Sequence, residues 1–172
     1  MNAGFWAAAI TGVLIAVLGP VNAALQARIG TWGMVAVVHL LGLAVGMLGL
    51  VLLDRTGFAR TDASLRLLLF SGVVLALALL VWAFRYAPGQ GVPPYAFLGG
   101  VLGALVVVGT IVAIQHLGVL AALITIVAGQ LATAALIDRF GLFDLPVVLL
   151  SPARLLGLLL VLAGVFLVVR KG

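Results

Sequence analysis

Uncharged polar side chains inside long apolar runs are the residues of this chain that could bind a ligand. They are Asn22, Gln26, His39, Gln115, Gln130 and Thr133. An unsatisfied polar group in hydrocarbon costs several kcal/mol, roughly, so such side chains are not stable there alone. Each therefore needs a partner on another helix, a water-filled cavity or a ligand.

Gln130 is the single amide in an apolar stretch that ends at Asp138-Arg139 and Gly141. Thr133 lies three residues further on and shares a helix face with Gln130. A threonine hydroxyl can also bond to a carbonyl of the preceding turn, so Thr133 is weaker evidence. We expect Gln130 to mark a polar site within the membrane.

Asn22 and Gln26 are four residues apart and share one face of the first apolar run. Pro20 just before them removes a backbone hydrogen bond, as in the broken helices that line transporter cavities. Two interpretations are open. The two amides line a cavity, or they join helices through interhelical bonds of about 1 kcal/mol each.

His39 lies about a third of the way into the second apolar run. Ionisable groups inside membranes are functional candidates, and imidazole titrates near neutral pH. The alternative is a neutral His39 that donates to a carbonyl across a helix contact. The apolar runs hold no acidic partner, which favours this alternative.

The residues needed for catalysis or metal binding are sparse. The four aspartates lie at or beyond the ends of the apolar runs, and the chain has no glutamate and no cysteine. The serines lack a recognisable arrangement of His and Asp, and His39 and His116 lack the spacing of a metal site. We therefore expect no enzyme activity, no metal and no cofactor.

The composition predicts an integral membrane protein. Of 172 residues, 66% are hydrophobic and only 8% are charged, against about a quarter charged in soluble domains. The net charge of +5 comes from cations scattered between apolar runs, which is typical of membrane anchors and not of a nucleic-acid interface.

A spanning helix needs about 20 mostly apolar residues. We expect an all-α bundle of six transmembrane helices in a single domain, residues 1–172. The predicted spans are approximately 5–27, 34–53, 67–84, 95–114, 119–137 and 152–169. Residues 54–66 are expected as an exposed loop, 86–94 as a helix-breaking cluster, 115–118 as a turn and 138–151 as a connection.

Six crossings divide the basic residues almost equally between the two membrane faces. One face holds Arg55, Arg60, Arg66, Arg170 and Lys171, and the other holds Arg28, Arg85, Arg139 and Arg154. The positive-inside rule therefore specifies orientation weakly. Both a single orientation with cytoplasmic termini and insertion in both senses as an antiparallel pair are open.

Two small-xxx-small patterns, Gly42 to Gly46 and Gly99 to Gly103, would let helix backbones approach closely. They predict a tightly packed bundle and say little about function.

Several stretches resemble the YdcZ-type branch of the drug/metabolite transporter superfamily, a group of small bacterial inner-membrane proteins. The stretches are Gly19-Pro-Val-Asn-Ala-Ala-Leu-Gln-Ala-Arg-Ile-Gly30, Leu98-Gly-Gly-Val-Leu-Gly-Ala-Leu105, Ala128-Gly-Gln130 with Ile137-Asp-Arg-Phe-Gly-Leu-Phe143, and Arg154-Leu-Leu-Gly157 with Ala163-Gly-Val165. The resemblance covers roughly residues 1–53 and 95–172. Members usually have five spanning helices, so residues 67–84 look like an added helix. The glutamate by which small multidrug exporters couple to protons has no counterpart here.

The resemblance implies a multi-pass protein of the bacterial inner membrane that transports a small metabolite or an amphipathic substrate. It implies a homodimer or a paired homologue, antiparallel in one arrangement. We expect alternating access around a midplane cavity lined by Gln130, Thr133, Asn22, Gln26 and His39. The alternative is a non-transporting membrane subunit that packs its helices against a larger complex.

Overall fold

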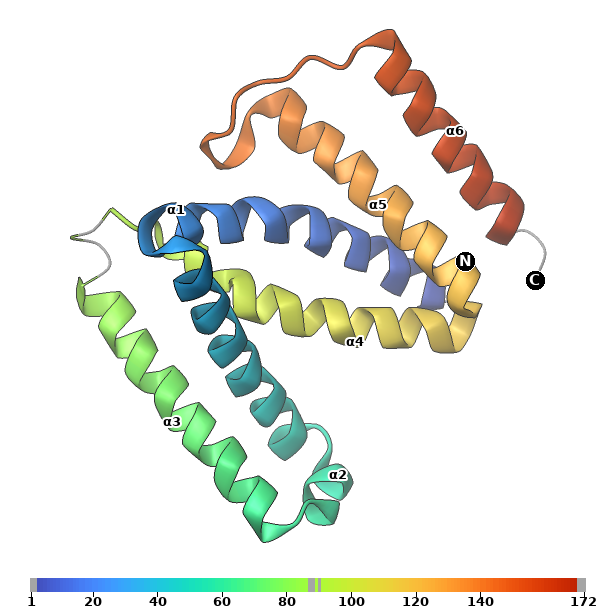
Figure 1. Ribbon diagram of the computed structural model, residues 1–172. Coiled ribbons are helices and arrows are strands. Elements are labelled where there is room, and N and C mark those ends of the chain that lie inside the picture. Colours follow the sequence, from blue (N-terminus) through green and yellow to red (C-terminus); the bar gives the residue numbers. More distant parts are fainter. Residues whose placement is uncertain (1–2, 87–88, 90, 170–172) are drawn as a thin grey trace. The chain divides into compact units, whose positions relative to one another are not determined.

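A computed structural model describes the backbone of residues 3–86, 89 and 91–169, and every regular element in these ranges is helical (Figure 1). The elements are α1 (Ala3–Leu52), α2 (Arg55–Arg60), α3 (Ala63–Tyr86), η2 (Pro94–Leu98), α4 (Gly99–Leu117), α5 (Val119–Phe140), η3 (Leu142–Asp144) and α6 (Pro152–Val169). Among the described residues, five helices are long and apolar enough to cross a membrane. The predicted class, an all-α integral membrane protein, is confirmed.

The 50-residue helix α1 contains the first two predicted spans. It is broken at Gly30, whose φ of 76° and ψ of 168° are non-helical. That backbone region is accessible essentially only to glycine. The six predicted segments therefore lie on five helices, and the connection between the first two is a single-residue break. That each segment crosses the bilayer, and that the chain is one domain, stay predictions.

The expected loop at residues 54–66 is largely helical. The Asp54 carboxylate begins α2 by accepting the backbone N–H of Gly57 at 2.8 Å and the Thr56 hydroxyl at 3.0 Å. The Asp62 carboxylate accepts the N–H of Leu65 at 2.7 Å at the start of α3. Both are N-cap bonds of the kind that short polar side chains make, so α3 begins at Ala63 and not at residue 67.

The other predicted connections are shorter than expected. Helix α5 continues to Phe140 and ends at Gly141, whose φ of 59° gives a left-handed cap. The turn before α5 is at Gly118 alone, because residues 115–117 belong to α4. The start of α6 at Pro152 agrees with the prediction. Within the predicted helix-breaking cluster, residues 87, 88 and 90 lie outside the described residues, as do Arg170 and Lys171.

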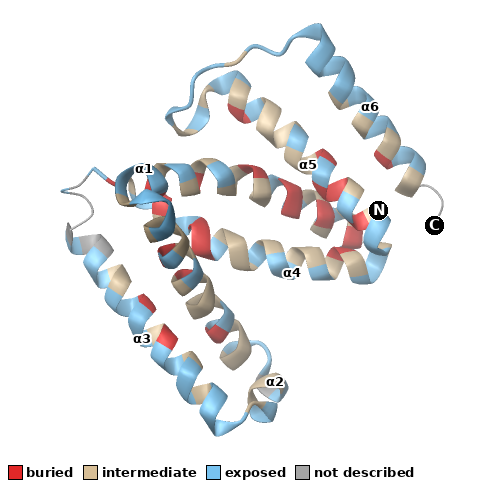
Figure 2. Ribbon diagram, in the orientation of Figure 1, coloured by how far each residue is buried: buried red, intermediate tan, exposed pale blue. Residues whose placement is uncertain are grey.

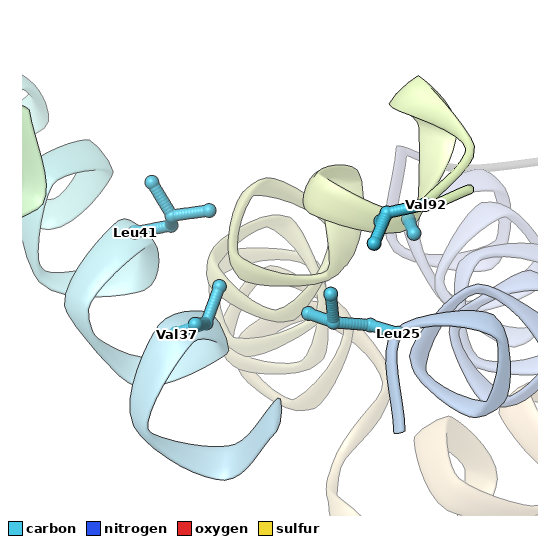
Figure 3. Packing of buried hydrophobic residues seen from close by; sticks show 5 residues of the cluster. Leu25, Val37, Leu41 and Val92 are labelled. Carbon is cyan, nitrogen blue, oxygen red and sulfur yellow. The ribbon is translucent and has the colours of Figure 1, made fainter. Parts of the chain in front are cut away.

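The chain divides into two compact units, each with its own buried cluster. One unit comprises Met1–Pro20 with Leu105–Gly172, and the other comprises Val21–Ala104. The core of the second is formed by Leu25, Val37, Leu41, Val92 and Ala96, four of which are labelled in Figure 3. The core of the first is formed by Ala8, Ala113, Ala122 and Ile126. Alanines dominate this core of the first unit, and their small side chains allow close approach of helix backbones.

The chain contains an internal repeat with an offset of 88 residues. The sequence Gly-Val-Leu-x-Ala begins at Gly12 and again at Gly100, 88 residues later. Gly118 follows Gly30 by the same interval, and its φ of 75° and ψ of 166° are almost those of Gly30. Each half of the chain is therefore a helix, a glycine break, a second helix and, after a connection, a third.

The packing of the first unit has a close helix crossing at Gly12. A Cβ atom on Gly12 would lie 2.7 Å from the backbone nitrogen of Gln130 and would collide with the carbonyl oxygen of Ile126. Both atoms are backbone and cannot rotate away. Helices α1 and α5 are therefore in direct backbone contact at this glycine.

The second unit has the equivalent crossing at Gly100. A Cβ there would lie 2.7 Å from the backbone nitrogen of Gly42 and 2.6 Å from the carbonyl oxygen of Val38. Val38 and Gly42 precede Ile126 and Gln130 by 88 residues each. The same contact is thus built twice from equivalent residues. Of the four glycines in the two predicted small-residue patterns, Gly42 takes part in this contact through its neighbour Gly100, which lies inside the second pattern, whereas a Cβ on Gly46 or Gly103 would meet nothing within 4 Å.

Candidate functional site

Asn22 carries the most distinctive polar atom of the described chain. Its Oδ1 is buried and has no hydrogen-bond partner among the described residues. A buried acceptor left without a donor costs about 1–3 kcal/mol. An atom in this state is a candidate to accept a hydrogen bond from a ligand.

Gly99, at the start of α4, provides the space in which the Asn22 amide lies. A Cβ atom on Gly99 would collide with Asn22 Oδ1 and would lie 3.0 Å from Val38 Cγ2. The absence of a side chain at this position therefore lets the Asn22 carbonyl oxygen pack directly against the start of α4, where it is buried. Gly99 was predicted only as a packing residue.

Gln26 shares the helix face of Asn22 but not its environment. It is exposed, and its Nε2 donates to the Thr31 hydroxyl at 3.3 Å, across the break at Gly30. The shared helix face predicted from the spacing therefore does not give the two amides the same environment: Asn22 Oδ1 is buried without a partner among the described residues, and Gln26 is paired on the surface.

His39 is exposed and bonds within its own helix. Its Nδ1 donates to the carbonyl oxygen of Val35 at 2.7 Å in the tautomer that this contact requires. The alternative expected from the sequence was donation across a helix contact, and the acceptor is instead one turn earlier in α1. His116 makes the same bond to Val112 at 2.8 Å in the last turn of α4.

Gln130 and Thr133 differ in whether their side chains have a hydrogen-bond partner, as Asn22 and Gln26 do. The Thr133 hydroxyl donates to the carbonyl of Gly129 at 2.8 Å, so it is satisfied by its own helix. Gln130 is half-buried, and its side chain has no hydrogen bond to the described residues. Its backbone lies at the Gly12 crossing. Gln130 is thus an available amide next to a fixed helix contact.

The predicted set divides between the two compact units. Asn22, Gln26 and His39 belong to residues 21–104, and Gln130 and Thr133 belong to the other unit. Each unit contains an amide that is at least partly buried and has no side-chain partner among the described residues, Asn22 in the first case and Gln130 in the second. The single cavity expected for all five residues stays a prediction.

A pocket between α5 and α6 was not predicted. It has a volume of about 200 Å³ and is lined by apolar residues of both helices together with Asp138 and Arg154. From the sequence, Asp138 was expected just beyond the end of a span, and Arg154 was counted only among the basic residues of one membrane face. Their separate helices bring them to one pocket, which spacing along the chain did not indicate. No cluster of three metal-ligating side chains occurs in the described part of the chain.

The comparisons identify one family. A family model described as "Putative inner membrane exporter, YdcZ" matches residues 60–167. This range includes α3, the segment that the resemblance set apart as added, and does not include residues 1–59. No curated protein and no solved structure matches the chain.

Proposed function

Because this chain belongs to the YdcZ family of inner membrane exporters, we propose that it moves a small uncharged or zwitterionic molecule across the membrane by alternating access. The protein is a multi-pass protein of the inner membrane and a transporter rather than an enzyme. The observation that carries the finer proposal is the buried Oδ1 of Asn22, which has no hydrogen-bond partner in the described part of the chain.

The chemistry of this atom defines the class of substrate. A carbonyl oxygen accepts hydrogen bonds and cannot donate them, so the substrate carries a hydroxyl, amide or ammonium donor. The chain has no glutamate, and its aspartates lie near the helix ends, so no membrane-centre carboxylate is available to bind a permanent cation. An uncharged or zwitterionic solute fits an amide better.

Gln130 is the proposed second ligand, since its amide is also available. Thr133, Gln26 and His39 are the proposed secondary ligands. Each of them already has a partner, so each would contribute only by exchanging that hydrogen bond for one to the substrate. We expect their removal to affect transport less than the removal of Asn22.

The internal repeat supports the alternating-access part of the proposal. A repeat of three membrane crossings starts on one face and ends on the other, so the second repeat starts from the opposite face and is inverted. Inverted repeats are the usual basis of alternating access in secondary transporters. The crossings at Gly12 and Gly100 would then be equivalent contacts in oppositely directed repeats.

The proposed assembly is a dimer or a pair with a homologue, as the resemblance implies. Figure 2 shows that α3 and α6 are mostly exposed in the single chain. Their exposed residues are largely leucine, valine and phenylalanine, which lipid or a second copy can cover equally well. Measurement of the molecular mass in detergent tests the proposed dimer.

Asn22→Leu is the experiment that tests the proposed site. Leucine is close in shape to asparagine and removes the unpaired acceptor, so we expect this variant to be more stable by about 1–3 kcal/mol and to lose transport. Ligands are first sought by thermal shift with millimolar glycerol, erythritol, glycine and alanine. Transport of a radiolabelled hit is then measured in proteoliposomes.

Gln26→Leu is the comparison on the same helix, because Gln26 is proposed only as a secondary ligand, and its amide is exposed and already paired. It should retain at least half of the flux. If Asn22→Leu instead unfolds more easily and transports normally, the amide joins helices and the proposed binding site is wrong. Loss of flux without the gain in stability would also contradict the argument, because the Asn22 acceptor would then have had a protein partner.

A further inference from the structure

The pocket between α5 and α6 has an apolar part and a charged end. On α5 it is lined by Leu131, Ala135 and Asp138, and on α6 by Arg154, Gly157 and Val161. These positions recur at three- and four-residue intervals, so they form one face on each helix. The pocket is therefore a groove that follows the seam between two packed helices.

Both charges lie at the same end of this groove. Asp138 is two residues from the end of α5, and Arg154 is in the first turn of α6. Leu131 and Val161 are each seven residues away from these charges along their helices, which corresponds to about 10 Å. The groove thus runs from an acid and a base at the helix ends towards the middle of two membrane-length apolar helices.

The Arg154 guanidinium is available to a ligand. Among the described residues it has no side-chain hydrogen bond or ion pair, and only its backbone N–H is used, donating to Ser151 Oγ at 3.3 Å. The Asp138 carboxylate likewise has no hydrogen bond or ion pair among the described residues, and the backbone carbonyl of this residue accepts the N–H of Val148 at 2.8 Å. Two opposite charges therefore line one pocket without neutralising each other through a bond.

The equivalent arginine of the other repeat shows what an engaged side chain looks like. Arg66 precedes Arg154 by 88 residues. Its guanidinium donates to the Ala59 carbonyl at 3.1 Å and to the Thr61 hydroxyl at 3.2 Å, and it lies 4.8 Å from the centre of the Phe58 ring. The fold thus satisfies Arg66 internally, whereas Arg154 has no such partner in the ranges that the structure describes.

The apolar part of the groove also differs from its counterpart. A Cβ atom on Gly157 would meet nothing within 4 Å, so this glycine faces open space. In the other repeat, the positions equivalent to Leu131 and Ala135 are Leu43 and Met47. The Leu43 side chain is packed against Gly72, and Met47 is buried. The space is filled by protein in one repeat and open in the other.

We propose that the α5–α6 groove binds a phospholipid whose head group carries a primary ammonium and a phosphodiester, as in phosphatidylethanolamine. The ammonium pairs with Asp138, the phosphate pairs with Arg154, and an acyl chain lies over Gly157 towards Leu131 and Val161. Charge complementarity selects the head group, because a groove with one acid and one base matches a zwitterion. The apolar continuation selects a lipid over a free zwitterion, which would leave that surface uncovered.

Native mass spectrometry of the delipidated full chain in detergent tests this proposal. The protein is titrated with palmitoyl-oleoyl phosphatidylethanolamine, phosphatidylcholine and phosphatidylglycerol. We expect one tightly bound phosphatidylethanolamine. Binding of phosphatidylcholine, whose ammonium cannot donate a hydrogen bond, and of phosphatidylglycerol, which has no ammonium, should be at least about tenfold weaker.

Three variants of charged residues and two variants of glycines separate the contribution of the head-group contacts from that of the groove. Asp138→Asn and Arg154→Gln should each weaken phosphatidylethanolamine binding at least about tenfold, whereas Arg139→Gln, an exposed arginine outside the groove, should not. Gly157→Leu should fill the groove and weaken binding similarly. Gly164→Leu is its control, because this glycine also has nothing within 4 Å and is not among the lining residues.

Several outcomes would overturn the proposal. Equal affinity for the three lipids would mean that the charges do not select the head group. Equal affinity for soluble glycerophosphoethanolamine would mean that the ligand is a free zwitterion. A change of oligomeric mass in Gly157→Leu but not in Gly164→Leu would mean that a second copy occupies the groove. Far-UV circular dichroism of each variant checks that the helices are retained.

Discussion

The helix crossing at Gly100 gives a prediction whose magnitude can be worked out from the structure. A Cβ on Gly100 would lie 2.6 Å from the Val38 carbonyl oxygen and 2.7 Å from the Gly42 nitrogen, whereas ordinary contact begins at 3.4 Å. In Gly100→Ala the backbones must therefore separate by about 0.8 Å. Overpacking of this kind costs about 1–3 kcal/mol.

Gly103→Ala is the matched control, one turn further along the same helix. A Cβ on Gly103 would meet nothing within 4 Å. Both substitutions gain up to about 1 kcal/mol in helix propensity, and this gain cancels in the comparison. We therefore expect Gly100→Ala to be less stable than Gly103→Ala by about 1–3 kcal/mol, and Gly103→Ala to be at least as stable as the natural chain.

The assay is unfolding by sodium dodecyl sulfate in mixed micelles, followed by far-UV circular dichroism, with a thermal scan alongside. For a chain of this length, 1 kcal/mol corresponds to about 2–4 °C in the midpoint temperature. Gly12→Ala tests the same contact in the other repeat, because Gly12 is equivalent to Gly100. A Cβ on Gly12 would lie 2.7 Å from the backbone nitrogen of Gln130. Equal midpoints for Gly100→Ala and Gly103→Ala would refute the close crossing.

Two further predictions concern the ends of helices. Gly30→Ala should destabilise the protein by about 1–3 kcal/mol, because the backbone conformation at this break is accessible essentially only to glycine. Gly19→Ala is the control and should not destabilise it, because a Cβ on Gly19 would meet nothing within 4 Å. Equal unfolding midpoints for the two variants would contradict the observed break. The N–H of Gly57 and the hydroxyl of Thr56 hold the pKa of Asp54 below its ordinary value. A pKa lowered by folding means that the stabilising effect is full above the unfolded pKa of about 3.9 and is lost as the pH falls through the folded pKa. Amide hydrogen exchange should therefore show that α2 loses less protection between pH 5 and pH 3 in Asp54→Asn than in the natural chain. An equal loss in the two proteins would exclude this carboxylate as its cause.

The predicted helix bounds agree with the structure where local chemistry decides. The run 152–169 agrees with α6, and 119–137 extends only to Phe140 in α5. Apolar length determines which segments are stable in hydrocarbon, and Gly141 and Pro152 end or begin helices through their own backbone properties. The loop expected at residues 54–66 was wrong because capping bonds of Asp54 and Asp62 begin helices there.

The internal repeat was present in the sequence but was not recognised. Its signal was the Gly-Val-Leu-x-Ala sequence at Gly12 and Gly100 together with the glycines at 30 and 118. In a glycine- and leucine-rich chain, short identities are expected by chance. The equivalent backbone contacts at an 88-residue offset distinguish this repeat from such coincidences.

The amino-acid sequence alone determined that this protein lies in a membrane. It also determined the approximate positions of the long helices and the resemblance to exporters. These are properties of composition and of short segments. Only the tertiary structure distinguished Asn22 from Gln26, because the burial of Asn22 Oδ1 depends on its contact with Gly99 of a distant helix. It also brought Asp138 and Arg154 to one groove. Whether a polar group is satisfied depends on neighbours that are far away along the chain, and therefore no local pattern could decide it.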